Sequence, residues 1–220
     1  MDITKFKAVI FDLDGTLVDS MGMWIDIDAE YLARFDLPVP PHLQQDINGL
    51  RWSETAEYFQ KRFHIEKSIE EIGQDWLDMA REQYRRRLPL KPGAREFISY
   101  LQDLKIPLGI ASSNHPDLIE DFLEAHGLDG CFSTVITCED VSAGKPDPSV
   151  YLTAARKLGA EPGECLVFED IPNGILAGKR AGMTVCAVYD DYSVNAEDLK
   201  KTLADGWIRD YRELFDFGCL

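Results

Sequence analysis

Polar side chains follow several apolar runs that the sequence predicts to be buried strands. Asp12 and Asp14 come directly after the first run, Ser112 and Asn114 after the second, and Glu169 with Asp170 after a later one. Ligands of open parallel sheets bind outside the carboxyl ends of the strands. Lys145 lies in a glycine- and proline-flanked loop between a predicted strand and a helix, so it can reach the same edge. We therefore expect seven polar groups in one crevice.

The chemistry of this set suits phosphoryl transfer. Four crowded carboxylates cannot all stay charged without a counter-ion, and Mg²⁺ prefers oxygen ligands, including one or two carboxylates, water and substrate phosphate. Ser112, Asn114 and Lys145 are donors that match the oxygens of a transferring phosphoryl group. The residues therefore predict a magnesium-assisted phosphate site.

The elements that must position these residues alternate between strand and helix patterns. Strands are expected at 8–11, 108–111, 134–137, 165–168 and 184–188, and helices at 94–104, 117–126, 149–158 and 171–181. This alternation implies right-handed crossovers and a parallel sheet with helices on both faces. An edge strand at 206–208 and a closing helix at 211–215 complete the expected α/β core.

Near the N-terminus, the alternation of strand and helix patterns is interrupted by a segment with helical spacing throughout. Between 19 and 87, apolar residues recur at intervals of three and four, as Trp24, Ile27 and Tyr31 illustrate, which is typical of amphipathic helices. The helix-breaking segment 88–93 contains two prolines and a glycine. We therefore expect an all-helical insertion at 19–88 within a core formed by 1–18 and 89–220.

With these motifs in this order, the chain resembles the haloacid dehalogenase-like hydrolases. Within them it is similar to the sugar-phosphate phosphatases and β-phosphoglucomutase, which carry a helical cap after the first strand. The resemblance rests on Phe11-Asp12-Leu13-Asp14-Gly15-Thr16, Ala111-Ser112-Ser113-Asn114, Gly144-Lys145-Pro146 and Phe168-Glu169-Asp170. It implies a Rossmann-like core, an inserted helical cap that selects the substrate, and hydrolysis of a small phosphorylated metabolite.

The resemblance also implies roles for individual residues. Asp12 becomes the nucleophile that carries an aspartyl-phosphate, and Asp14 the general acid and base. Magnesium is expected on Asp12, Asp14 (through its main-chain carbonyl) and Asp170, with Glu169 binding directly or through water. The phosphoryl group is expected on Ser112, Asn114 and Lys145.

Other reactions of the same family remain as alternatives. Asp14 argues against dehalogenation, which needs only the nucleophile. Phosphonate cleavage uses a cap lysine as a Schiff base, and the cap offers only Lys61 and Lys67, with no evident apolar pocket around them. A phosphohexose mutase needs a cap histidine, yet Trp24 occupies that position, and an indole cannot shuttle a proton. Hydrolysis is therefore favoured, with the mutase and a catalytically silent binding protein as alternatives.

Two cap residues are candidates for substrate contact. Arg51 follows Gly49-Leu50, a segment that resembles the substrate-reading loop of related hexose-phosphate phosphatases. Alternatively, Arg51 is a solvated arginine at the start of a helix. Trp24 has two possible roles: it contacts the substrate, or it is an aromatic residue on the buried face of an amphipathic helix. The sequence does not distinguish a hexose, polyol, glycolate or nucleotide phosphate.

The amino-acid composition argues against several classes of binding partner. The 39 acidic and 23 basic residues give a formal net charge of −16, which repels nucleic acid and anionic lipid. A phosphate site must therefore be built locally from a metal, a lysine and backbone N–H groups. Five cysteines without a CxxC pair suggest reduced thiols. No secretory signal or spanning segment is visible, so we expect a cytoplasmic monomer without nucleic-acid or membrane partners.

Overall fold

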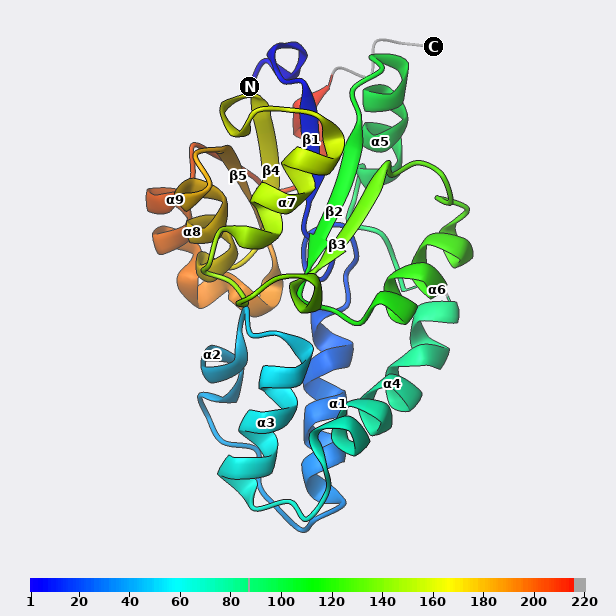
Figure 1. Ribbon diagram of the computed structural model, residues 1–220, viewed down its shortest axis with the longest axis vertical. Helices are drawn as coiled ribbons and strands as arrows, with labels where there is room; N and C mark the ends of the chain where they lie inside the picture. Colours follow the sequence, from blue (N-terminus) through cyan, green and yellow to red (C-terminus); the bar gives the residue numbers. More distant parts are fainter. Residues whose placement is uncertain (87, 216–220) are drawn as a thin grey trace.

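A parallel six-stranded sheet forms the upper part of the molecule in Figure 1. The computed structural model describes residues 1–86 and 88–215. The strands lie in the order β3-β2-β1-β4-β5-β6. Their bounds are β1 Ala8–Phe11, β2 Leu108–Ser112, β3 Thr134–Thr137, β4 Cys165–Glu169, β5 Thr184–Val188 and β6 Gly206–Ile208. The expected α/β fold with a parallel sheet is confirmed, including its edge strand.

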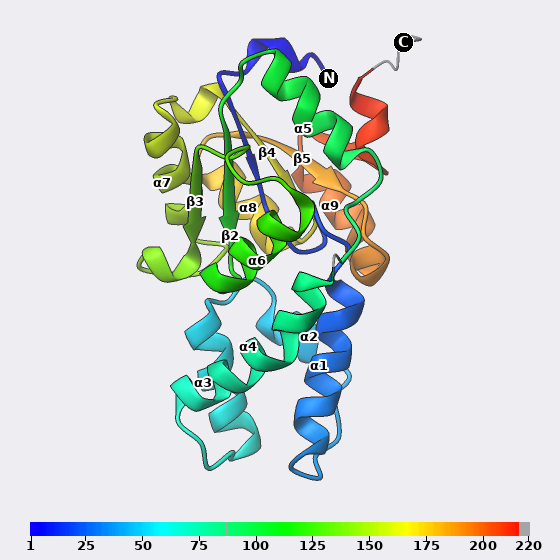
Figure 2. The same cartoon turned by 90° about the vertical axis from the view of Figure 1, so that its right-hand side faces the viewer.

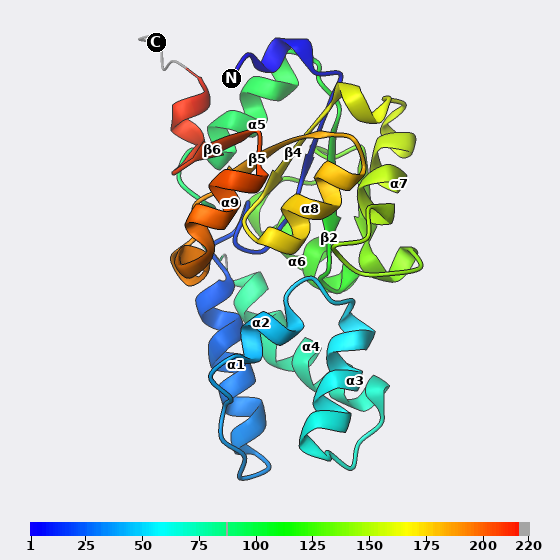
Figure 3. The same cartoon turned by 90° about the vertical axis from the view of Figure 1, so that its left-hand side faces the viewer.

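Helices cover both faces of this sheet because its strands are apolar on both sides. Along β1, Val9 and Phe11 belong to one hydrophobic cluster, and Ala8 and Ile10 belong to the other. The first cluster includes α5 (Ala94–Asp103) and α6 (Pro116–His126), and the second includes α7 (Ser149–Leu158) and α8 (Pro172–Arg180). Figure 2 looks onto α5 and α6, and Figure 3 onto α8 and α9 (Glu197–Leu203). Burial on both faces is typical of all-parallel sheets.

Four helices lie beyond the carboxyl ends of the strands, in the lower part of Figure 1. They are α1 Met21–Ala33, α2 Leu43–Ile47, α3 Trp52–Phe63 and α4 Ile69–Arg85. Ser68 starts α4 with a capping box, because its hydroxyl accepts from the Glu71 N–H while the Glu71 carboxylate accepts from the Ser68 N–H. Tyr31, Phe59 and Trp76 pack their rings together between these helices.

The two chain segments that join this helical part to the sheet run side by side. Val18 and Leu90 form an antiparallel bridge. The Asp19 N–H donates to the Pro89 carbonyl at 2.8 Å, and the Lys91 N–H donates to the Leu17 carbonyl at 2.8 Å. The two connectors therefore form one hydrogen-bonded ribbon.

The C-terminal part differs in detail from the expectation. The closing helix expected at 211–215 is a 3₁₀ turn over Tyr211–Leu214, and α9 was not predicted. Cys131, Cys138, Cys165 and Cys186 are free, as expected, while Cys219 lies outside the described residues. Within the described chain, no helix combines the length and apolarity needed to cross a membrane.

Candidate active site

Strands β1, β2 and β4 are neighbours, and each delivers polar residues to the same edge of the sheet. Asp12 follows β1, while Ser112 and Glu169 are the last residues of β2 and β4. Phe11, the residue before Asp12, stacks on Phe168 with ring centroids 5.2 Å apart. Aromatic packing of this kind is worth about 0.5–1.5 kcal/mol beyond area burial. The aromatic core therefore fixes the strand ends from which the polar groups project.

Lys145 holds two of the carboxylates together. Its Nζ lies 2.6 Å from Asp12 Oδ1 and 2.5 Å from Glu169 Oε1. Burial opposes the charge on Lys145, but the carboxylates of Asp12 and Glu169 outweigh it and raise the pKa of Lys145 well above its ordinary value. Glu169 is fully engaged, because Oε1 also accepts from the Tyr151 hydroxyl and Oε2 accepts from the N–H groups of Asp170 and Ile171. This lysine stays cationic at neutral pH.

The charge of the acidic groups exceeds what Lys145 balances. Carboxylate oxygens of Asp12, Glu169 and Asp170 lie within 4.8 Å of one another. Burial, only partly offset by Lys145, raises the pKa of Asp12 to about 7. Burial, followed by the charges of Glu169 and Asp12, also raises the pKa of Asp170 well above its ordinary value. The group therefore needs further positive charge before all three carboxylates can ionise.

Asp170 has one oxygen without a partner. Thr16 Oγ1 donates to Asp170 Oδ1 at 2.9 Å, whereas Oδ2 is buried and accepts no hydrogen bond from the described chain. Gly15 lies against that carboxylate at φ +79°, and a Cβ there would stand 2.3 Å from Oδ2. Oxygen donors, excess negative charge and an orphaned oxygen fit a bound divalent cation such as Mg²⁺.

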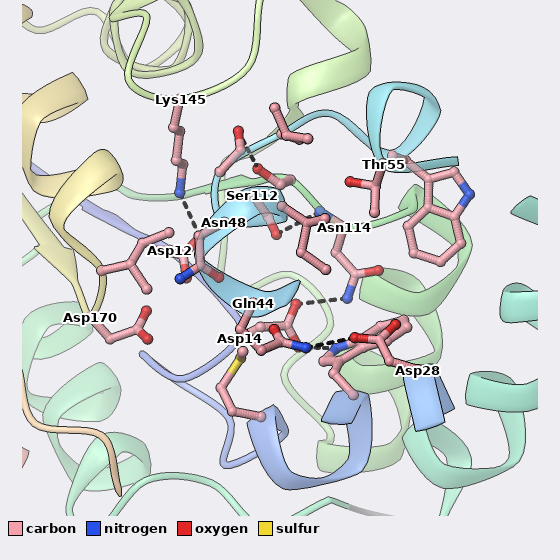
Figure 4. A pocket seen from close by; sticks show the side chains of 18 of the residues that line it. Asp12, Asp14, Asp28, Gln44, Asn48, Thr55, Ser112, Asn114, Lys145 and Asp170 are labelled. Carbon is pink, nitrogen blue, oxygen red and sulfur yellow. Dashed lines mark hydrogen bonds and ion pairs between the residues drawn. The ribbon is translucent and has the colours of Figure 1, made fainter. Parts of the chain in front are cut away.

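Asp14 is held by four donors. Its Oδ1 accepts from Ser20 Oγ at 2.5 Å, from Trp24 Nε1 at 3.2 Å and from the Tyr84 hydroxyl. Its Oδ2 accepts from Asn114 Nδ2 at 2.7 Å (Figure 4). Trp24 and Tyr84 come from α1 and α4, so the helical part of the chain fixes a carboxylate of the sheet edge.

The sequence-predicted donors separate into two sets. Lys145 lies on Asp12, and Ser112 lines the same cavity, with its Oγ accepting from the Asn114 N–H at 3.1 Å. Asn114 instead directs its amide to Asp14 and to the Tyr84 hydroxyl. In this arrangement Asn114 positions Asp14, and its contact with phosphate stays a prediction.

A cavity of about 160 Å³ joins the sheet edge to the helices beyond it. Its walls include Trp24, several unpredicted residues of the helical part, and six of the seven polar residues predicted at the strand ends, Glu169 being the exception. Arg51 is not among the lining residues described. Its guanidinium pairs with Glu54 at 3.0 Å at the start of α3, and its buried Nε has no partner in the described chain.

Sequence reasoning missed several residues of this site, including Tyr84, Asp28 and Gln44. Tyr84 reaches Asp14 from the end of α4, seventy positions along the chain. Asp28 and Gln44 line the cavity from α1 and α2. The sequence held only weak signals for these residues. Asp28 is a carboxylate on the buried face of α1, beside Tyr31 and Leu32. Tyr84 continues the apolar stripe of α4.

A six-stranded parallel sheet with acidic residues at its strand ends and a helical part beyond them defines a Rossmann-like α/β protein with a candidate active site at that edge. The family model described as haloacid dehalogenase-like hydrolase matches residues 9–188. The chain belongs to that family, and it is a phosphatase-type hydrolase within it.

Known proteins resemble the chain over most of its length. It is 29% identical to hexitol phosphatase B of Escherichia coli strain K12, covering 96% of this chain and 95% of that protein. It is 33% identical to the bifunctional riboflavin kinase/FMN phosphatase of Arabidopsis thaliana, covering 83% of this chain but spanning about half (48%) of that protein. The solved β-phosphoglucomutase of Clostridium difficile shares the fold, with a TM-score of 0.82, 19% identity, and coverage of 96% of this chain and 93% of that one.

Proposed function

We propose that this chain is a magnesium-dependent phosphatase that releases phosphate from a small phosphorylated metabolite of the sugar-phosphate type through an aspartyl-phosphate on Asp12. The observation that carries the proposal is the contact of Lys145 with Asp12 beside the unpartnered oxygen of Asp170. The similarity to hexitol phosphatase B supports a phosphorylated carbohydrate as substrate.

Magnesium would be held by Asp12, Asp170 and the main-chain carbonyl of Asp14. When bound, the ion neutralises negative charge as a carboxylate approaches the phosphate. The residues that can accept it include the orphaned Asp170 Oδ2. Glu169 already uses both oxygens, so in this proposal it positions Lys145 and contributes charge.

In this proposal the reaction has two steps, formation and hydrolysis of the aspartyl-phosphate, and different residues act in each. Asp12 attacks phosphorus while Asp14 gives its proton to the departing alcohol oxygen. In the second step Asp14 takes a proton from the water that attacks the aspartyl-phosphate. Lys145 and Ser112 hold the phosphoryl oxygens, and Ser20, Trp24, Tyr84 and Asn114 keep the Asp14 carboxylate in place. The helical cap, residues 19–88, covers this site and reads the rest of the substrate.

Hydrolysis is favoured over phosphohexose mutation by the cap side of the cavity. The described residues that line it include no histidine, and Trp24 uses its indole N–H to hold Asp14. A mutase needs a second acid and base to return the phosphoryl group to sugar. Incubation with glucose 1-phosphate and its bisphosphate activator should therefore yield phosphate, whereas isomerised hexose phosphate as the main NMR signal would favour the mutase.

The direct test is release of phosphate from a panel of phosphorylated metabolites and from p-nitrophenyl phosphate, with Mg²⁺ and with excess EDTA. Activity should require Mg²⁺ and vanish in Asp12→Asn. Failure to turn over any substrate would support the catalytically silent alternative. Undiminished activity of Asp12→Asn would contradict the aspartyl-phosphate mechanism.

The cellular setting belongs to the same proposal. We take the chain to act as a monomer in the cytoplasm, and two observations support this: the net charge of −16 and the free thiols of the four described cysteines. Size-exclusion chromatography with light scattering should return a mass near 24.9 kDa.

A further inference from the structure

The cap side of the cavity contains a buried carboxylate that phosphoryl transfer does not use. Asp28 lies on α1 with 6% of its surface exposed. Gln44, from α2, donates to Asp28 Oδ2 at 2.6 Å. Figure 4 shows Asp28 and Gln44 together in the wall that also includes Asp14 and Asn114.

No cation of the described cap balances this carboxylate. Within the described chain, the Asp28 side chain accepts a hydrogen bond from Gln44, whose amide is neutral. Among the described residues that line the cavity, Lys145 is the only cation, and Asp12 and Glu169 engage it at the sheet edge. Burial raises the pKa of Asp28 to about 7, against the smaller effect of the Gln44 amide. An uncompensated buried carboxylate is costly, and a costly group in a binding cavity is typical of a functional residue.

Aromatic rings surround the same space. Trp24, Trp52 and Trp76 all line the cavity. The Trp24 and Trp52 centroids are 5.7 Å apart, and those of Trp52 and Trp76 are 5.8 Å apart, both edge to face. Trp76 Nε1 is buried without a partner in the described chain, so this side of the cavity also offers an N–H donor to an acceptor atom of the substrate. Indole faces attract cations by about 0.5–2 kcal/mol, most strongly when water is excluded.

We propose that Asp28 determines substrate specificity by pairing with a protonated amine on the leaving group of the substrate, within the wall formed by the three tryptophans. The inference rests on the proposed phosphatase function and narrows its substrate class to amine-bearing phosphate monoesters. A neutral polyol would supply hydrogen bonds to Asp28 but no charge, so it would leave the buried carboxylate unbalanced. An ammonium group satisfies both features at once.

The test compares matched substrates that differ by an amine. Suitable pairs are glucosamine 6-phosphate with glucose 6-phosphate, pyridoxamine 5'-phosphate with pyridoxine 5'-phosphate, and phosphoethanolamine with ethylene glycol monophosphate. The full chain with Mg²⁺ should show a kcat/KM at least about tenfold higher for the amine in one pair or more. Equal values within every pair, or preference for the neutral member, would overturn the proposal.

Variants connect the preference to Asp28. Asp28→Asn should bring the amine-to-neutral ratio of kcat/KM to within about twofold of one, because Asn keeps the shape and loses the charge. Asp46→Asn removes an exposed carboxylate of α2 as a matched control and should keep the parent ratio. An unchanged ratio in Asp28→Asn would contradict the inference. No phosphate release by the parent from any substrate, p-nitrophenyl phosphate included, would instead defeat the proposed function itself.

Discussion

The indole Nε1 of Trp24 donates to Oδ1 of Asp14 at 3.2 Å, linking helix α1 to the loop that follows β1. The same N–H lies 3.1 Å from the Tyr84 hydroxyl, which also donates to Asp14. A bulky aromatic residue in the cap therefore contacts the carboxylate proposed as general acid and base. The packing of α1 and α4 against the sheet edge therefore sets the orientation of that carboxylate.

Removing these donors should weaken acid catalysis selectively. Trp24→Phe and Tyr84→Phe should each lower kcat for an alkyl phosphate by about tenfold or more, because a misplaced acid protonates the alcohol poorly. p-Nitrophenolate leaves without a proton, so p-nitrophenyl phosphate should suffer less. Tyr58→Phe, which breaks only a surface contact with Asp46, is the control and should match the parent. Equal losses on both substrates would point to cap misfolding instead.

Asp14→Asn should separate the two chemical steps. Asn cannot protonate the leaving group or deprotonate water, but p-nitrophenyl phosphate still transfers its phosphoryl group to Asp12. Stopped-flow absorbance should show a burst of about one equivalent and then a slow phase. Mass spectrometry of the acid-quenched protein should find phosphate on Asp12. Linear turnover at the parent rate would assign Asp14 to another role.

Asp28→Asn should stabilise the fold at alkaline pH. The folded pKa of Asp28 is raised to about 7 from 3.8, so the parent has its full stability contribution from this group below about pH 4 and loses it as the pH rises through 7. The shift corresponds to at most about 4 kcal/mol. Urea unfolding should therefore show a variant advantage of about 1–4 kcal/mol at pH 8 that shrinks toward pH 4.

The control for this prediction is Asp46→Asn, which changes an exposed carboxylate and should show no comparable pH trend. A variant less stable than the parent at pH 8 would mean that the Asp28 charge is compensated in the folded protein. Stability gained together with amine selectivity lost would be the signature of a residue kept for binding.

Strand positions were predictable because every strand of the core is short, apolar and followed by polar residues. Asp12, Ser112, Lys145 and Asp170 could be assigned to one crevice from this pattern alone, since a parallel sheet brings its strand ends together. Tyr84 and Asp28 could not, because their positions depend on how cap helices pack over the sheet. In the sequence, Tyr84 and Asp28 look like ordinary residues of the buried faces of their helices.

Arg51→Ala tests the remaining cap candidate. Its pairing with Glu54 and its absence from the described cavity wall favour a part in seating α3 over substrate reading. The Arg51 backbone N–H stands close to Gly144, where a Cβ would meet it at 2.9 Å. We expect a similar loss, within about threefold, on every substrate tested. A changed order of substrate preference would restore Arg51 as a specificity residue.

The hydrogen-bonded ribbon between the connectors has a consequence for how such enzymes diversify. Since Val18 and Leu90 are already bridged, the chain leaves and re-enters the sheet at one point. A different helical cassette inserted between these positions would leave the strand order unchanged, but it would have to supply its own donors to Asp14 in place of Ser20, Trp24 and Tyr84. New substrate ranges are then open to evolution, or to deliberate exchange, through a single pair of junctions.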